Sequence, residues 1–178
     1  MTTNVITSDR LILRSAHEDD LGTLHRIVFS DPKVMRQAFY GQTFTKEKAA
    51  EFFHSHFDFD GSGTKAGVLS LKDTGEIIGF AGLIASTELG EQDYEIGFVL
   101  GCEYWGKGYA TEIGLAQIKY GFEVVGCSRL LGMVLPENEA SKAALMKLGM
   151  TYSTTIEMEG RGKREIYIIS NSVDNSVE

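Results

Sequence analysis

WGKGYATE, residues 105–112, lies between a predicted strand at residues 94–100 and the longest predicted helix at residues 110–125. A glycine-bearing loop that enters a helix leaves backbone N–H groups without partners at the positive end of the helix dipole, a favourable place for a phosphate. Gly106 and Gly108 have no Cβ, so an anion can approach the main chain closely, and Lys107 can add positive charge. The loop indicates a phosphate site, although a plain strand-to-helix turn explains the glycines equally well.

Two common phosphate-binding loops do not match this stretch. A Walker A loop places Ser or Thr after its Gly-Lys pair, whereas Gly108 follows Lys107 here, and the upstream glycine is missing. A Rossmann fingerprint needs Gly or Ala three positions after its second glycine, where this chain has Thr111. A nucleotide-binding α/β protein is therefore disfavoured.

The rest of the chain mixes the two hydrophobic periodicities. The patterns predict strands at 11–13, 66–71, 77–84, 94–100, 130–135, 152–158 and 164–169, and helices at 17–29, 45–54, 110–125 and 139–148. Asp31-Pro32 is expected to end the first helix, and two apolar stripes predict that the helix at 110–125 is broadly buried, with Gly126 as its carboxyl cap. The fold class is mixed α/β.

Composition limits the function. The chain has 178 residues, of which 43% are apolar and 24% charged, as expected for one globular domain over residues 1–178, with a core at 8–170 and a polar tail at 171–178. Its 17 basic and 25 acidic residues give a formal net charge of −8, which argues against nucleic acid as a partner. No apolar run reaches membrane-spanning length, and two cysteines form no disulfide framework, so we expect a cytoplasmic protein.

The loop and four other stretches together resemble one family. Residues 105–112 resemble the acetyl-CoA pyrophosphate loop of the GNAT superfamily of N-acetyltransferases, which reads Gln/Arg-x-x-Gly-x-Gly/Ala; Glu103 occupies the Gln/Arg position here. The other four stretches resemble the RimJ/RimL type of this superfamily, which acetylates ribosomal-protein N-termini. They are SDRLILR at 8–14, YEIGFVL at 94–100, PENEAS at 136–141 and KLGM at 147–150. The ordered set is more specific than the loop alone.

The resemblance implies a GNAT fold and a co-substrate. That fold has a central, mostly antiparallel twisted sheet of about seven strands with about four helices. Acetyl-CoA is the expected co-substrate, and no metal is expected. The residues that the resemblance places against it are Phe98, Val99, Leu100, Gly106, Lys107, Gly108, Tyr109, Ala110, Thr111, Asn138 and Ser141.

Glu95 is the predicted general base. An alternating strand places Glu95, Gly97 and Val99 on one face, and a carboxylate on an internal strand is costly unless it has a role or a partner. Acceptor amines are mostly protonated at neutral pH, so a base is useful. The alternatives are a Glu95 that is solvated or paired with an arginine, with Asp93 or a water chain taking the proton.

Ser141 is the second predicted catalytic residue. The tyrosine acid that the family often carries seven residues after its motif asparagine is replaced here by Leu145. The RimJ/RimL type instead offers a serine near the CoA sulfur, which corresponds to Ser141. Both Ser141 and Asn138 have a second explanation, because either can cap the helix that begins beside them.

A metal site is the weaker explanation of residues 54–60, HSHFDFD. In an extended segment His54, His56, Asp58 and Asp60 would share one side, but in a helix residues two apart do not face each other. We instead expect this segment to end the second helix and to form a wall of the acceptor cleft.

The predicted function is transfer of an acetyl group from acetyl-CoA to a primary amine. The resemblance favours a protein N-terminal α-amine as the acceptor. A small amine such as a polyamine or an aminoglycoside is the alternative within the same chemistry, and a non-catalytic acyl-CoA sensor is the alternative outside it. A monomer or homodimer is expected.

Overall fold

The computed structural model describes residues 1–39 and 41–172; most of the predicted polar tail, from residue 173 onward, lies outside the described residues. One open sheet of eight strands runs through the molecule in the order β1-β2-β3-β4-β5-β6-β8-β7. Only the β5–β6 pair is parallel, and the other neighbours are antiparallel. The strands are β1 Asn4–Thr7, β2 Leu11–Arg14, β3 Ala66–Leu71, β4 Ile77–Ser86, β5 Asp93–Leu100, β6 Arg129–Val134, β7 Thr151–Met158 and β8 Gly162–Ser170.

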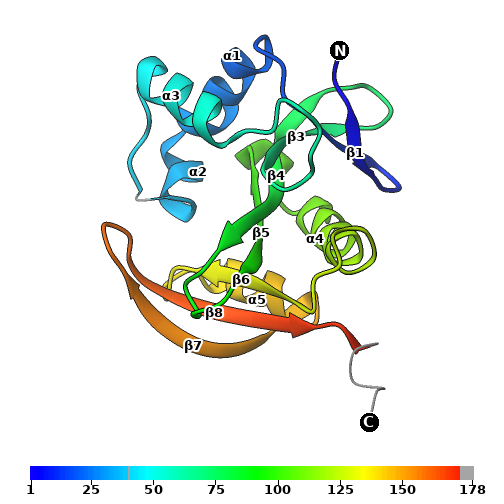
Figure 1. Cartoon of the computed structure of the whole chain (residues 1–178). Coiled ribbons are helices and arrows are strands. Elements are labelled where there is room, and N and C mark those ends of the chain that lie inside the picture. Colours follow the sequence, from blue (N-terminus) through cyan, green and yellow to red (C-terminus); the bar gives the residue numbers. More distant parts are fainter. Residues whose placement is uncertain (40, 173–178) are drawn as a thin grey trace.

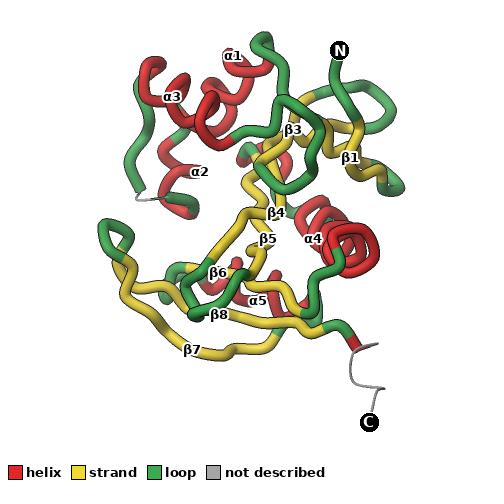
Figure 2. The backbone as a smooth tube through the Cα atoms, in the orientation of Figure 1, coloured by secondary structure: helices red, strands yellow, loops and turns green. Residues whose placement is uncertain are grey.

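Helices cover both faces of the sheet. They are α1 Asp20–Leu24, α2 Pro32–Gln37, α3 Lys46–His56, α4 Tyr109–Tyr120 and α5 Glu139–Lys147, with π-helical turns at His25–Phe29 and Gly121–Val125 and a 3₁₀ turn at Cys102–Tyr104. Helices α1 to α3 gather on one side of strands β3 to β5, and α4 lies on the other (Figures 1 and 2). The predicted mixed α/β fold with a mostly antiparallel sheet is confirmed.

Two elements were not predicted from the sequence. Strand β1 adds an eighth strand and pairs with β2, although its sequence is too short and polar to stand out. Helix α2 begins where the first helix was expected to end. Asp31 caps it by accepting a hydrogen bond from the Lys33 N–H at 2.9 Å, and Pro32 occupies its first position. Proline is tolerated there because that N–H has no helical partner, so Asp-Pro starts this helix as well as separating it from the previous one.

Helix α4 is less buried than its two stripes predict. Ile113 and Ile118 are buried, whereas Leu115 is 50% exposed and Val124, in the turn that follows, is 66% exposed. The prediction of a broadly buried helix is therefore wrong in part for both stripes, because the sheet and α5 cover only one side of the helix. Gly126 adopts a left-handed conformation with φ 83° and ends the helix as predicted.

The core is divided into two clusters that meet at β5. One cluster fills the space among the amino-terminal strands, α1 to α3 and part of α4, and the other lies among α4, α5, β6 and β8. Phe98 and Tyr120 pack against both. Strand β5 therefore joins two halves of the molecule, which Figure 1 shows as an upper amino-terminal and a lower carboxy-terminal part.

The two halves are held together at one end of the parallel strand pair. Asp93 begins β5 and is 4% exposed; its two carboxylate oxygens accept hydrogen bonds from Arg129, which begins β6, at 2.8 and 2.7 Å. Two residues further on, Glu95 pairs with Leu131, and within the described residues the strands pair nowhere else. The strands are thus fixed at their amino ends and unpaired toward Leu100 and Val134.

We predict that Asp93→Asn destabilises the fold by about 2–3 kcal/mol. Removing one charge of a buried pair leaves the other uncompensated, which typically costs ~3–5 kcal/mol. Glu91 also contacts Arg129, at 2.9 Å, so the cost falls below that range. Urea unfolding measures the change. Asp73→Asn, in the exposed β3–β4 turn, is the matched control, and equal stability of the two variants would contradict a structural role for the pair.

Candidate active site

Two cavities meet at the unpaired end of the β5–β6 pair. The first cavity, of about 510 Å³, lies among the end of β5, the glycine loop, the start of α4 and the start of α5. The second cavity, of about 430 Å³, lies among β4, β5, the end of α3 and the β7–β8 turn. The residues that line both are Gln37, Ala38, Phe98, Val99, Asn138 and Ser141. A molecule in one cavity can therefore meet a molecule in the other beside β5.

Two carbonyls of β5 accept hydrogen bonds from side chains. The Gly97 carbonyl accepts a hydrogen bond from Gln117 Nε2 at 3.2 Å, and the Leu100 carbonyl accepts one from Trp105 Nε1 at 3.0 Å. Gln117 is fully buried in α4. Trp105 thus gives the Leu100 carbonyl a partner beyond the point where β6 pairs with β5. Neither Gln117 nor Trp105 was predicted as part of the site.

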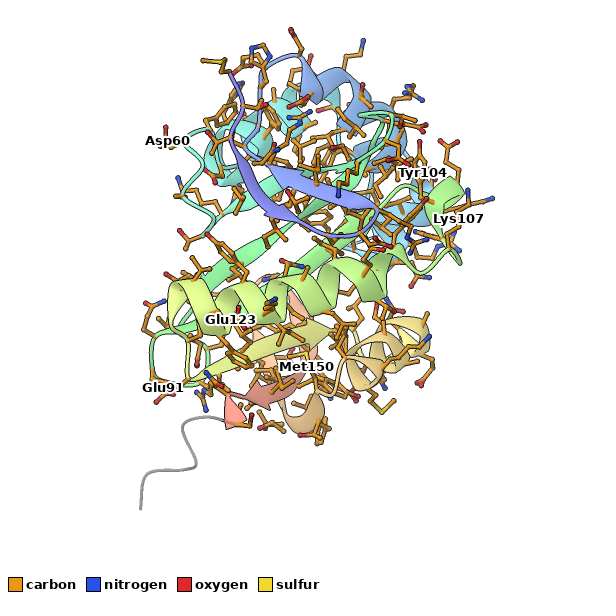
Figure 3. The ribbon with its side chains drawn as sticks, turned by 90° about the vertical axis from the view of Figure 1, so that its right-hand side faces the viewer. Asp60, Glu91, Tyr104, Lys107, Glu123 and Met150 are labelled. Atoms are coloured by element: carbon orange, nitrogen blue, oxygen red, sulfur yellow. The ribbon has the colours of Figure 1, made fainter. Side chains whose placement is uncertain are left out.

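The glycine loop presents backbone N–H groups to the first cavity. Gly106 and Gly108 have φ angles of 73° and 83°, and Gly108 is the amino cap of α4 without any capping side chain among the described residues. The N–H groups of the first helical turn consequently have no helical acceptor. All of the loop and helix residues predicted to bind acetyl-CoA line this cavity except Lys107. Figure 3 shows Lys107 beside Tyr104 at this end of α4, and its Nζ lies 6.0 Å from the Tyr104 ring.

The first turn of α4 is fixed to the β1–β2 turn by Glu112. Its carboxylate accepts hydrogen bonds from Ser8 Oγ at 2.5 Å, from the Arg10 N–H at 2.8 Å and from Arg10 Nε at 2.7 Å. Burial alone would raise the pKa of Glu112, but these hydrogen bonds outweigh burial and lower it. Arg10 also donates to the Lys107 carbonyl at 2.9 Å. The motif at 8–14 and the motif at 105–112 are therefore parts of one structure.

Glu95 lies in the wall of the second cavity. The side chain is partly buried, and its carboxylate has no hydrogen bond or ion pair with the described residues. Burial raises the pKa of Glu95 to about 7; the charges of Arg161 and Arg164 oppose that rise and the charge of Glu88 adds to it. At neutral pH the group is thus present in both protonation states, which suits a general base.

Asp93 does not line either cavity, since its carboxylate is engaged by Arg129. Glu95 lines the second cavity, whereas Asp93 does not. Phe98, Val99 and Leu100 line the first cavity.

Asn138 and Ser141 lie at the boundary between the cavities. Asn138 caps α5, because its Oδ1 accepts a hydrogen bond from the Ser141 N–H at 3.1 Å, and its Nδ2 donates to the Gln37 carbonyl at 3.3 Å. The capping explanation of Asn138 is thus confirmed, and its amide also fixes the end of α2. The Ser141 hydroxyl has no hydrogen bond with the described residues and is available to a ligand.

The side chains of residues 54–60 have separate partners. His54 Nε2 lies 2.9 Å from Glu18, His56 stacks on Phe52 with ring centroids 4.4 Å apart, and Asp58 accepts backbone N–H groups from residues 60–63. Across residues 1–39 and 41–172, no three His, Cys, Asp or Glu side chains are grouped to hold a metal. Of these residues His56 lines the second cavity, together with Phe52. None of the described helices could cross a membrane.

The main residues that the sequence did not reveal are Arg161 and Arg164 at the β7–β8 turn, which line the second cavity. They surround a Gly-rich hairpin turn, and a turn gives no sign of which surface it faces. The sequence predicted the hairpin itself correctly.

Comparison with known proteins identifies the family. The acetyltransferase (GNAT) domain family matches residues 10–151, so the chain belongs to that family. It is 31% identical over 152 residues to YkkB of Bacillus subtilis, covering 85% of this chain and 87% of YkkB. It is 32% identical over 145 residues to the uncharacterized N-acetyltransferase YnaD of the same organism, covering 82% and 81%. The chain is accordingly an N-acetyltransferase, and such enzymes use acetyl-CoA.

Solved structures share the whole architecture. A GNAT acetyltransferase from Bacillus anthracis superposes with a TM-score of 0.77 at 27% identity over 93% of this chain and 97% of that one. Two further structures are less than 25% identical, so their likeness shows the fold alone. One is a spermidine N-acetyltransferase from Vibrio cholerae in complex with CoA and spermine, at 19% identity and a TM-score of 0.73, covering 91% of this chain and 96% of that one. The other is RimL, a ribosomal L7/L12 α-N-protein acetyltransferase in complex with CoA, at 16% identity and a TM-score of 0.72, covering 94% and 98%. The GNAT fold is confirmed, whereas the RimJ/RimL type stays a prediction.

We predict that Gly108→Val weakens CoA binding about tenfold to a hundredfold. Valine is strained at φ 83°, and its Cβ would lie 3.3 Å from the Arg10 guanidinium, so the loop must shift and its N–H groups lose their alignment. Titration calorimetry measures the affinity. Gly75→Val is the matched control: it has a similar φ of 75° in the open β3–β4 turn. Unchanged CoA affinity in Gly108→Val would contradict binding at this loop.

Proposed function

We propose that the protein transfers an acetyl group from acetyl-CoA, bound in the first cavity, to an α-amine that enters through the second cavity, with Glu95 as the general base. The observation that carries this proposal is the Glu95 carboxylate, which lines the second cavity close to the residues that both cavities share and has a pKa of about 7. A carboxylate that lines a cavity, has no hydrogen bond or ion pair with the described residues and has a perturbed pKa is a candidate for proton transfer.

The first cavity fits acetyl-CoA. Unpaired N–H groups at residues 108–111 suit the pyrophosphate, and Gly106 leaves room for it, since a Cβ there would meet nothing within 4 Å. Lys107 is exposed beside the loop and adds charge for the outer phosphates. The edge of β5 at Phe98, Val99 and Leu100 suits the pantetheine amides, with Asn138 and Ser141 next to the thioester. When bound, acetyl-CoA supplies the acetyl group in activated form.

Glu95 has one task in this reaction. An amine must lose a proton before or during attack on the thioester carbonyl, and Glu95 accepts that proton directly or through a water molecule. A thiol has a pKa of ~8.5, so its thiolate leaves without strong protonation. A well-placed base consequently matters more here than a strong acid, which agrees with Leu145 at the position of the family tyrosine.

The match of pKa values favours an α-amine as the acceptor. A protein α-amine has a pKa of ~8, about one unit above that of Glu95, whereas an alkyl amine at ~10.4 lies more than three units above it. Each unit of mismatch costs ~1.4 kcal/mol in the proton transfer. This favours an α-amine, such as the protein N-terminus expected of the RimJ/RimL type, over a polyamine or aminoglycoside. A sensor without turnover has no use for an ionisable Glu95.

We predict that Glu95→Gln lowers kcat by about 10²–10⁴ at pH 8, as is typical of general-base loss. Because the pKa of Glu95 is raised to about 7, the carboxylate is mostly protonated below pH 7 and cannot accept a proton. The wild-type kcat should therefore rise from pH 6 to about 7.5 and then level off, whereas the kcat of the variant should rise only at higher pH, as the acceptor amine with its pKa of ~8 loses its proton without help. CoA release at saturating acceptor measures both profiles.

Glu88→Gln is the matched control for this variant. It removes a carboxylate that is exposed and outside both cavities, and whose charge raises the pKa of Glu95. The kcat of this control should still rise between pH 6 and about 7.5, with the rise shifted slightly to lower pH. Coincident profiles for wild type and Glu95→Gln would mean that another group or water takes the proton.

We predict that Ser141→Ala lowers kcat only about twofold to tenfold. The loss is that of one hydrogen bond from a neutral donor to a leaving group that departs readily, and such a bond is worth ~0.5–1.5 kcal/mol. The Asn138 cap uses the Ser141 backbone N–H, so α5 stays intact. Steady-state kinetics with CoA affinity as a second readout tests this, with Ser128→Ala, an exposed serine, as the control. Complete loss of turnover with normal CoA affinity would show that Ser141 controls the rate.

A further inference from the structure

The second cavity has a charge balance opposite to that of the chain. Its described lining contains three basic side chains, Lys65, Arg161 and Arg164, and a single carboxylate, that of Glu95. The chain as a whole has 25 acidic and 17 basic residues. A basic cavity in an acidic protein concentrates anionic ligands and repels cationic ones. This distribution bears on which amines can enter.

Arg164 builds the turn that forms one wall of this cavity. It is 4% exposed, and its guanidinium donates hydrogen bonds to the carbonyl oxygens of Arg161 and Lys163. A third contact, to the Phe39 carbonyl at 3.5 Å, connects the turn to the segment after α2. Arg164 therefore holds the backbone of Arg161 in place.

Arg161 is the side chain that the turn presents to a ligand. It is partly buried, it lines the cavity, and its guanidinium makes no hydrogen bond or ion pair with the described residues. Its charge opposes the rise in the Glu95 pKa, so the two groups are close enough to act on one small molecule. A guanidinium binds a carboxylate through two parallel hydrogen bonds.

Aromatic side chains complete the lining. Phe39, Phe52 and Phe80 lie within 6.4 Å of one another by ring centroid, and His56 stacks on Phe52. This apolar surface accommodates the uncharged part of an acceptor. It also lowers the local dielectric, which strengthens an ion pair formed inside the cavity relative to one in water.

We propose that the acceptor carries a carboxylate close to its α-amine, with the amine at Glu95 and the carboxylate bound by Arg161. A free amino acid has this chemistry through its α-carboxylate, and a peptide that begins with Asp or Glu has it through its first side chain. A polyamine lacks the anion and would bring further positive charge to Lys65, Arg161 and Arg164. This inference rests on the proposed function and narrows its acceptor.

The test compares acceptors that differ in the anionic group alone. One arm pairs free phenylalanine with phenylalaninamide, and the other pairs the amidated peptides Asp-Ala-Ala and Asn-Ala-Ala; spermidine is included as a polycation. CoA release gives kcat/KM, expressed per neutral amine so that differences in amine pKa cancel. We expect the carboxylate member to be preferred at least tenfold in one arm or both, and that arm identifies the source of the carboxylate. Spermidine should be the poorest substrate.

Variants assign the preference to Arg161. Arg161→Gln should lower kcat/KM for the preferred carboxylate acceptor about tenfold to a hundredfold, the range for a lost charge-assisted hydrogen bond, and lower it far less for the amide partner. Arg161→Lys should retain part of the preference, since lysine keeps the positive charge but cannot form the two parallel hydrogen bonds of a guanidinium. Lys163→Gln is the matched control, because it removes an exposed positive charge from the same turn outside the cavity.

The outcomes separate the two proposals. If amides or spermidine are acetylated as well as the carboxylate acceptors, or if Arg161→Gln lowers both members of a pair equally, the carboxylate inference is overturned and the acetyltransferase proposal stands. If CoA binds but no α-amine in the panel is acetylated, the proposed α-amine function fails, and the inference fails with it.

Discussion

The parallel contact between β5 and β6 is the constraint on which the site depends. The Asp93–Arg129 pair fixes the amino ends of the strands, the strands meet at Glu95 and Leu131, and beyond that point they do not pair. A sheet can open in this way only if the exposed backbone groups find other partners, and Trp105 supplies one for the Leu100 carbonyl. Both cavities, and the residues they share, lie at this opening.

The opening also determines the electrostatics of the two cavities. In the first, backbone N–H groups provide the positive potential, and the nearby carboxylate of Glu112 is neutralised by Arg10 and directed away into the β1–β2 turn. In the second, Glu95 is left partly desolvated beside Arg161. One site is thus suited to phosphates and the other to proton transfer, although the chain as a whole is acidic.

The parts of the fold that could be predicted are those with a local signal. The alternating strands and the glycine loop were recognisable, as were the caps at Asn138 and Gly126, because turn and cap preferences act over a few residues. Strand β1 has too little apolar sequence to be recognised, and Asp31-Pro32 is compatible with either end of a helix. The exposure of Leu115 depends on what packs against α4, which periodicity cannot show.

The acceptor side of the site was less predictable for a physical reason. Glu95 was identified because a carboxylate on an internal strand is anomalous in its own local context. Arg161 is not anomalous at all, since an arginine in a Gly-rich hairpin turn is ordinarily solvated. The position of Arg161 in the wall of the second cavity depends on the β8–β6 pairing and on the hydrogen bonds of Arg164. The proposed acceptor contact therefore depends on tertiary structure that no local pattern reveals, whereas the glycine loop proposed for acetyl-CoA is one continuous stretch of sequence.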